Sequence, residues 1–413
     1  MASVKPFQCI RPEPGSAKRV AALPYDVYNR KEALKETLRE PLSFLKIDRA
    51  ETQFPEIVDT YDPAVYAKAK ELLGDMMERG IFVTDTEECY YIYELTMGGR
   101  AQTGIVACTS IDDYLSNVIK KHENTREDKE LDRINHVDIL NAQTGPIFLA
   151  YRTDLIINQI VEEVKQAIPL YSFTAADGIR HQIWRISEPA WVEGIRQAFA
   201  GTESIYIADG HHRAASAVKV GLKRRQLKPD YTGLEEFNYF LSVLFSHDQL
   251  MIMPYNRAVK DLNGLTAEEF LDRVGNHFDI TLVGKQPYAP REKAEFGMYL
   301  EGEWYILTAA QTLRDIMDPV KALDVSLLQD YLLGPVLGIE DPRTDKRIDF
   351  IGGIRGLKEL ERRVEEDMKV AFSMYPTSIT ELFNVSDADQ LMPPKSTWFE
   401  PKLRSGLFIH SLE

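Results

Sequence analysis

Apolar residues recur along the chain with two different spacings. Residues 66–79 (YAKAKELLGDMMER) carry them at helical spacing, and Gly80 follows at the position of a C-terminal cap. Residues 90–95 and 102–108 are apolar runs typical of strands, and residues 97–100 between them suit a hairpin connection. The first 115 residues are therefore predicted to contain both helices and strands.

The rest of the chain alternates irregularly between the same two patterns. A capping box of Thr266 and Glu269 marks one helix start, and residues 296–307 suit a hairpin that turns at Glu301 and Gly302. The other predicted helices are 155–168, 189–199, 325–333, 357–367 and one starting at 379, and the other predicted strands are 182–186, 240–245, 250–253 and 370–374. This order favours the α+β class over a doubly wound parallel sheet.

Composition narrows the class of protein. The chain has 413 residues, and 49 Lys plus Arg against 64 Asp plus Glu give a formal net charge of −15, which argues against a nucleic-acid partner. Only three cysteines occur, in no Cys-x-x-Cys spacing, which fits a reducing compartment. The sequence shows neither an N-terminal signal peptide nor an apolar run that would span a bilayer, so a cytoplasmic protein without a membrane partner is predicted.

Residues 205–217 (IYIADGHHRAASA) concentrate the candidate chemistry. An apolar strand ends at Ala208 and a helix begins near Arg213, with Asp209, Gly210, His211 and His212 between them. A glycine in such a turn lets backbone N–H groups approach an anion, and a guanidinium matches phosphate oxygens. Asp209 suits Mg²⁺ or a hydroxyl proton, and because the two histidines are adjacent, we expect one to face the ligand and the other to brace the loop. The structural alternative is a turn in which Asp209 caps the helix.

Three other polar segments have structural alternatives of their own. KHENT, from Lys121, also suits a solvated helix start, and PPKST, from Pro393, suits a proline-stiffened loop. A cluster containing Tyr25 and Asp26 either forms a wall of the same cleft or makes a surface turn, and the turn is favoured.

The segment IADGHHRAASAVKVG resembles the phosphate-binding signature of the ParB/sulfiredoxin-like fold, in the version found in free serine kinases. HENT from His122, TGPIF from Thr144 and PKST from Pro394 also resemble segments of those kinases. The resemblance implies that a ParB/sulfiredoxin-like core spans 116–258, between an N-terminal α+β region (1–115) and a C-terminal α+β region (259–413) that closes the site.

Nearly the whole chain resembles a large bacterial and archaeal family known as a domain of unknown function, DUF1015. The shared segments are KPFQCIRP, LPYDVYNR, KHENT, ADGHHRAASA, MPYNR and MPPKSTWFEPKLRSGL. Two departures from the kinases stand out. Lys121 replaces a proline before His122, and Trp398 and Phe399 replace an Arg-His pair, which bears on what the pocket accepts.

The resemblance to the kinases implies a nucleotide-dependent phosphotransferase acting on a small hydroxyl-bearing metabolite such as free L-serine, with ATP or ADP and Mg²⁺ as cofactors. Glu123 would be the general base, and Asp209 and His212 would be catalytic, with Asp209 holding Mg²⁺. The residues implied in binding phosphate and substrate are Gly210, His211, Arg213, His122, Lys395, Ser396 and Thr397. Two alternatives are a nucleotide-binding regulator without transfer activity and a metal-dependent hydrolase built on His211, His212 and Asp209, although adjacent histidines are poorly spaced for zinc.

Overall fold

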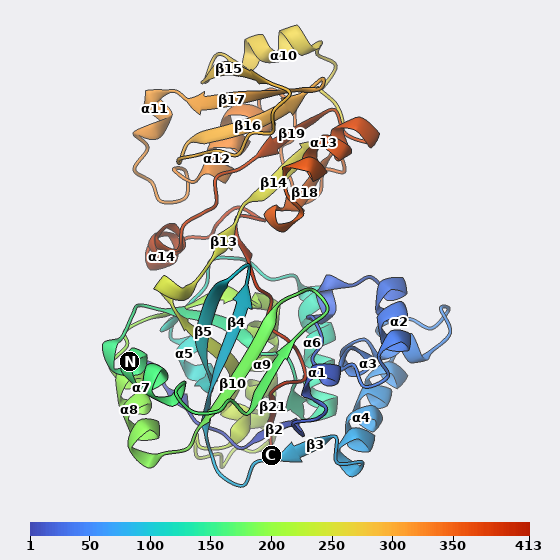
Figure 1. Cartoon of the computed structure of the whole chain (residues 1–413), viewed down its shortest axis with the longest axis vertical. Coiled ribbons are helices and arrows are strands. Elements are labelled where there is room, and N and C mark those ends of the chain that lie inside the picture. The colour runs from blue at the N-terminus through green and yellow to red at the C-terminus, as the bar shows by residue number, and fades with distance from the viewer. The chain divides into compact units, whose positions relative to one another are not determined.

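The chain forms two compact units in a computed structural model that describes all 413 residues (Figure 1). The first unit consists of Met1–Leu250 together with Pro401–Glu413, and the second consists of Met251–Glu400. The first unit thus contains the predicted region 1–115 and all but the end of the predicted core 116–258. Residues 401–413, which the sequence assigned to a C-terminal region, return to the first unit.

The first unit is built on a nine-stranded mixed sheet. Its strands run in the order β6-β11-β8-β12-β5-β4-β10-β9, and β1 also pairs with β5. The pairs β11–β6 and β12–β8 are parallel, and the other pairs are antiparallel. The bounds are β1 Val4–Lys5, β4 Tyr90–Met97, β5 Arg100–Ser110, β6 Ile119–Lys120, β8 Ile147–Tyr151, β9 Tyr171–Thr174, β10 Arg180–Ile186, β11 Ile205–Asp209 and β12 Tyr239–Ser246.

A second, four-stranded sheet joins distant parts of this unit. It has the order β3-β2-β21-β7, with bounds β2 Cys9–Pro12, β3 Phe82–Thr84, β7 Ala142–Gln143 and β21 Ile409–Ser411. The returning segment, as residues 401–413 are called from here on, therefore supplies β21, which lies between two strands from the first half of the chain.

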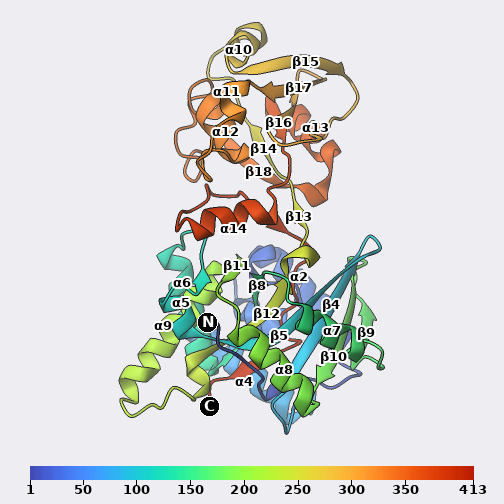
Figure 2. The ribbon, with the colours of Figure 1, turned by 90° about the vertical axis from the view of Figure 1, so that its left-hand side faces the viewer.

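Helices lie on both sides of the central strands of the large sheet, with α5, α6 and α9 on one side and α7 and α8 on the other (Figure 2). Apolar residues of α7, α8 and α9 pack with those of β4, β5, β8, β11 and β12 in one core cluster. Helix α6 packs on α9, and α4 packs on α6. The bounds are α1 Ala17–Val20, α2 Arg30–Arg39, α3 Leu45–Asp48, α4 Pro63–Glu78, α5 Ile111–Leu115, α6 Glu127–Leu140, α7 Leu155–Val164, α8 Pro189–Ala200 and α9 His211–Leu227.

The second unit has its own six-stranded antiparallel sheet, of order β15-β17-β16-β19-β14-β18, and a two-stranded pair, β13-β20. Trp304, Leu360 and Ala371 belong to its core cluster. The strands are β13 Ile252–Met253, β14 Tyr255–Val259, β15 Phe278–Gly284, β16 Glu295–Leu300, β17 Glu303–Ala309, β18 Ile348–Gly352, β19 Val370–Ser373 and β20 Trp398–Phe399, and the helices are α10 Ala267–Val274, α11 Gln311–Arg314, α12 Asp324–Leu328, α13 Leu357–Glu366 and α14 Ile379–Asp387.

These elements confirm the α+β class, because mostly antiparallel sheets combine with irregularly placed helices. The capping box of Thr266 and Glu269 is present, and the hairpin β16–β17 turns at Glu301 and Gly302 as predicted. The predicted helix 325–333 is instead a short α12 followed by a π-helical turn, Gln329–Leu333. The predicted helix 155–168 ends earlier, at Val164. No helix of the structure combines the length and apolar character needed to cross a bilayer.

Candidate functional site

Strand β11, Gly210 and helix α9 form the strand–turn–helix unit that the sequence predicts. The helix begins at His211, two residues earlier than expected. Gly210 has φ 94° and ψ 33°, a left-handed conformation that costs glycine little. No side chain caps the helix, so the N–H groups of its first turn have no intrahelical or side-chain acceptor. This arrangement suits a bound anion.

Asp209 ends strand β11 and pairs with a lysine from the returning segment. The Lys402 Nζ donates to Oδ2 of Asp209 at 3.0 Å, and the Asp209 side chain is 34% exposed. Burial favours the neutral carboxyl, but Lys402 and Arg213 outweigh it and hold the pKa of Asp209 well below its usual range. Asp209 is therefore an ionised carboxylate flanked by two cations.

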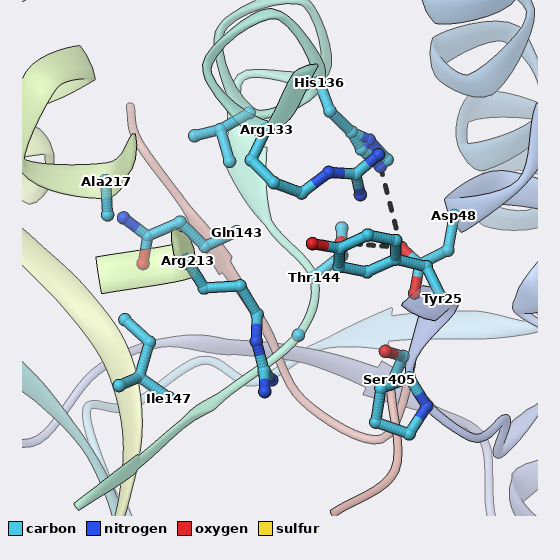
Figure 3. A pocket seen from close by; sticks show the side chains of 13 residues that line it. Tyr25, Asp48, Arg133, His136, Gln143, Thr144, Ile147, Arg213, Ala217 and Ser405 are labelled. Atoms are coloured by element: carbon cyan, nitrogen blue, oxygen red, sulfur yellow. Dashed lines mark hydrogen bonds and ion pairs between the residues drawn. The ribbon is translucent and has the colours of Figure 1, made fainter. Parts of the chain in front are cut away.

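The Arg213 side chain packs over Gly210, where a Cβ would lie 3.0 Å from its Nε, and it also lines a cavity between several stretches of the chain (Figure 3). Its Nη1 donates to the carbonyl oxygen of Pro146, and its guanidinium lies beside Gly145. Inside the cavity, the space that the centres of water molecules can occupy is about 40 Å³. This is enough for a few waters or a small polar ligand. Its other lining residues are Pro24, Tyr25, Asp48, Arg133, His136, Val137, Gln143, Thr144, Ile147, Ala217 and Ser405.

The cavity holds charges of both signs. The Arg133 guanidinium lies 3.9 Å from the centroid of the Tyr25 ring, and its Nε donates to Oδ2 of Asp132. Burial raises the pKa of Asp48, although Arg133 opposes this, and the Thr144 hydroxyl donates to the Asp48 carboxylate at 3.1 Å. Tyr25–Val27 form the favoured turn, a single 3-10 turn with Asp26 exposed, and the Tyr25 ring also lines this cavity.

His122 and His211 meet although they are far apart in the sequence. Their ring centroids are 4.5 Å apart with the planes nearly perpendicular, and both side chains are buried. The His122 backbone N–H lies 3.5 Å from Nε2 of His211, at the limit for a hydrogen bond. Burial lowers the pKa of His122 to about 4 and lowers that of His211 well below its ordinary value, so both rings are neutral.

Glu123 lies beside this pair. Its Oε2 is 3.9 Å from Nδ1 of His211, and its side chain is 46% exposed. The structure thus brings Glu123, His122 and His211 together at the start of α9, in agreement with their predicted proximity. An exposed carboxylate beside two neutral imidazoles is able to accept a proton from a ligand hydroxyl.

His212 faces a different neighbour. Its Nε2 accepts a hydrogen bond from the backbone N–H of Arg126 at 3.0 Å, just before helix α6. This contact fits the expectation that one of the two histidines braces the loop. A catalytic role for His212 stays a prediction.

Lys395, Ser396 and Thr397 belong to the second unit. There the backbone carbonyl of Lys395 accepts from Arg257 at 3.0 Å, and the Ser396 hydroxyl donates to the carbonyl of Pro393 at 2.6 Å. Their predicted part in substrate binding stays a prediction.

Asp209 does not fit a resident magnesium ion. Its carboxylate already has the ammonium of Lys402 at 3.0 Å and lies within the field of Arg213, and a dication would be repelled by both. The residues whose ligand atoms do lie together are His122, Glu123 and His211. Nitrogen donors of this kind suit first-row transition metals better than Mg²⁺.

Sequence reasoning missed several residues of the site. Arg133 and His136 are three residues apart on α6, which places both on one helix face, and Asp48 ends the short helix α3. Lys402 and Ser405 belong to the KLRSGL segment. Only the resemblance to the family pointed to this segment, and it did not single out either residue. Spacing along the chain carries no signal for contacts across so many residues.

The chain belongs to the family described as "Protein of unknown function (DUF1015)", whose sequence pattern matches residues 4–326. No curated protein matches the chain.

Several solved structures are similar at low identity. A free serine kinase variant in complex with AMP has 14% identity and a TM-score of 0.36, covering 73% of this chain and 92% of its own. The truncated SbnI from Staphylococcus aureus has 10% identity and a TM-score of 0.38, covering 72% and 85%. A conserved hypothetical protein from Pyrococcus furiosus has 15% identity and a TM-score of 0.33, covering 74% and 94%.

Proposed function

We propose that the chain is a nucleotide-dependent phosphotransferase that acts on a small hydroxyl-bearing metabolite, with free L-serine as the first acceptor to test. The observation that carries the proposal is the uncapped start of α9 after the left-handed Gly210, with Lys402 and Arg213 close to Asp209 and Glu123 nearby. The motif resemblance to free serine kinases supports the same function.

The phosphates of ATP or ADP would bind at the start of α9. The backbone N–H groups of Gly210, His211 and His212 would donate to phosphate oxygens, and Lys402 would add positive charge. Phosphoryl transfer depends mainly on such positioning and charge neutralisation. A molecule of net charge −15 needs these local cations to attract a polyanion.

The acceptor hydroxyl would lie between the terminal phosphate and Glu123. Glu123 would take the hydroxyl proton while the acceptor oxygen forms a bond to phosphorus. The bond from phosphorus to the bridging oxygen of the nucleotide would break, so ATP leaves as ADP, or ADP as AMP, and L-serine becomes O-phosphoserine. Mg²⁺ would enter with the nucleotide phosphates, and no residue step depends on it.

The cavity beside Arg213 would hold the rest of the acceptor. Arg133 and Arg213 offer guanidinium groups to an acidic group, and Asp48 offers a carboxylate to a basic one. Tyr25, Thr144 and Ser405 add hydroxyls that hydrogen-bond in either direction.

The test is a transfer assay with ATP and with ADP, in Mg²⁺, against L-serine, L-threonine and L-homoserine, with products measured by mass spectrometry. We expect O-phosphorylated product from at least one pair. Glu123→Gln should lower kcat by about 100-fold or more, because the proposed base is lost. Asp209→Asn should lower it by about tenfold, because Lys402 loses the carboxylate that holds it beside the phosphates. The matched controls Glu127→Gln and Asp128→Asn, on exposed positions of α6, should leave kcat unchanged.

Survival of turnover in both site variants would refute the mechanism. Nucleotide binding without transfer to any acceptor would instead indicate the regulatory alternative.

A further inference from the structure

Two buried histidines and a glutamate converge where the loop before α6 meets the start of α9. His122 is 2% exposed and His211 is 5% exposed, and their rings meet edge to face. One ligand atom from each of His122, Glu123 and His211 lies within 4.8 Å of the other two. Phosphate binding at the α9 amides does not account for this grouping, because neutral imidazoles contribute no charge to it.

His122 has the hydrogen-bonding pattern of a histidine ligand. Its ring donates to the backbone of Ile207, which places the proton on one nitrogen. The other nitrogen, Nδ1, is buried and has no hydrogen-bond partner. A buried acceptor without a partner destabilises the fold, because its lost hydration is not replaced. Histidines that bind metals commonly donate their second ring N–H to a carbonyl in this way, which aims the free lone pair at the ion.

The gap between Glu123 and His211 also suits an ion. At 3.9 Å, Oε2 of Glu123 and Nδ1 of His211 are too far apart for a direct hydrogen bond. Two ligand atoms on one tetrahedral zinc ion lie about 3.4 Å apart, given bonds of about 2.1 Å. Glu123 is partly exposed, so its carboxylate is able to move the few tenths of an ångström required.

Binding a metal through Nδ1 of His211 fixes the tautomer of this ring at little cost. A metal at Nδ1 requires the ring proton at Nε2, which faces the His122 backbone N–H at 3.5 Å. That contact is at the limit for a hydrogen bond, so little is lost when it is broken.

We propose that His122, Glu123 and His211 bind a divalent first-row transition metal ion, of which zinc is the representative. Two imidazole nitrogens and one carboxylate suit Zn²⁺, Mn²⁺ or Fe²⁺ and disfavour Mg²⁺ and Ca²⁺, which prefer oxygen ligands. Three protein ligands leave a coordination position for water or a ligand on the exposed side of Glu123. The site goes beyond the proposed phosphotransfer and does not require it, and because a bound ion would occupy the Glu123 carboxylate, the proton transfer to Glu123 applies to the metal-free protein.

The experiment measures metal binding by the full chain without nucleotide or acceptor. Protein treated with EDTA is dialysed against Zn²⁺, and a parallel sample is titrated with Co²⁺ while its visible d–d absorption is recorded. We expect one tightly held zinc ion per chain, retained in a 100-fold excess of Mg²⁺, and a Co²⁺ spectrum more intense than that of the hydrated ion. Displacement by Mg²⁺, or no retained zinc, would overturn the proposal.

The variants assign the ligands. Glu123→Gln and His211→Asn should each weaken zinc binding by at least tenfold, while Glu127→Gln and His277→Asn should leave it unchanged. Circular dichroism checks that each variant folds, and the exposed position of Glu123 keeps that variant informative if a histidine variant unfolds. Equal zinc affinity in wild type and Glu123→Gln would show that the ion binds elsewhere. Because no substrate is present, failure here is separate from failure of the transfer assay.

Discussion

The charge state of Asp209 depends on residues from two distant parts of the chain. Arg213 lies four positions along the sequence, whereas Lys402 arrives from the returning segment and pairs directly with the carboxylate. Without Lys402, a partly buried negative charge would face the phosphates of an incoming nucleotide. Lys402 is therefore a contributor to phosphate affinity that no local motif identifies.

Replacement of this lysine tests the point. Lys402→Gln should weaken binding of ATP or ADP by about tenfold or more, because the neutral amide leaves the Asp209 charge uncompensated beside the phosphates. Lys402→Arg, which keeps the charge, should lose much less. Isothermal titration calorimetry at two salt concentrations checks this, since the difference between the variants should shrink at high salt. Equal affinity in Lys402→Gln and wild type would remove Lys402 from the site.

A second buried residue links the fold to pH. His181 is fully buried, with its Nδ1 2.8 Å from the Tyr93 hydroxyl and Nε2 accepting from Arg404 at 3.3 Å. Burial, with help from the Arg404 charge, lowers the pKa of His181 to about 3, against an ordinary value of 6.5. The folded protein thus keeps His181 neutral at pH values at which the unfolded chain protonates it.

Stability should therefore fall as the pH drops below 6.5 and continue to fall toward pH 3, because the unfolded state binds the extra proton in that window. At pH 5, His181 alone should account for a loss of about 2 kcal/mol. In His181→Gln, which does not titrate, the loss of unfolding free energy between pH 7 and pH 5 should be smaller by that amount. Urea denaturation at both pH values measures it. An unchanged pH dependence would contradict the assignment.

The sequence predicted individual site residues only where residues that are neighbours in the fold are also neighbours in the chain. Asp209, Gly210 and His211 could be predicted because a strand end, a turn and a helix start are local events. Asp48, Arg133 and Lys402 could not, because their pairing with the motif depends on tertiary packing.

Helix α9 carries the site on its first turn, and its middle packs closely against neighbouring segments at Gly221. Gly221 lies where the helix passes close to other backbone: a Cβ there would be 2.5 Å from the carbonyl oxygen of Phe237 and 2.7 Å from Ile111. Gly74, within α4, has nothing within 4 Å of such a Cβ. Two glycines with the same helical propensity thus have opposite packing surroundings.

Alanine substitutions should separate propensity from packing. Gly74→Ala should raise the free energy of unfolding by about 0.5–1 kcal/mol, the usual gain in a helix interior. Gly221→Ala should instead lower it by about 1–3 kcal/mol, because the methyl group meets a carbonyl that cannot easily move. Chemical denaturation of both variants provides the comparison, and a stabilising Gly221→Ala would contradict the close approach.

Hydrophobic spacing predicted the amphipathic helices well and the charged one poorly. Helices α4, α8 and α13 show the predicted apolar spacing and lie close to their predicted bounds. Helix α6 lies in a stretch that was interpreted only as polar, with a charged helix start as one alternative. Its buried side includes Glu130, Asp132, Arg133 and His136. Because these residues are polar, the sequence lacks the apolar residues at helical spacing from which an amphipathic helix is predicted.

The two units differ in how they depend on the rest of the chain. The second unit is continuous in sequence, and the pairing of Ile252 with Phe399 joins its two ends. The first unit needs both ends of the chain, since β21 pairs with β2 and β7. The second unit is thus organised as an insertion within the first.

Residues 251–400 expressed alone should therefore fold. We expect a cooperative thermal transition and dispersed amide signals in a nitrogen–proton NMR spectrum, because the fragment keeps its sheet and its apolar core. Residues 1–400, by contrast, should lose the cooperative transition of the first unit, since they lack the buried Leu407, Phe408 and Ile409. A folded first unit in that truncated chain would show that the returning segment is dispensable.

The order of synthesis gives the returning segment a further significance. The ribosome must make the 150 residues from 251 to 400, which takes roughly 8 to 30 seconds at ordinary rates, before Lys402 and Ser405 exist. During that interval, β2 and β7 wait for the strand that joins them, and Asp209 has no lysine partner. A ribosome that stalls within the second unit releases a chain containing the whole Asp-Gly-His-His-Arg motif without a complete site. The site can therefore be complete only in chains that have been translated through residue 405.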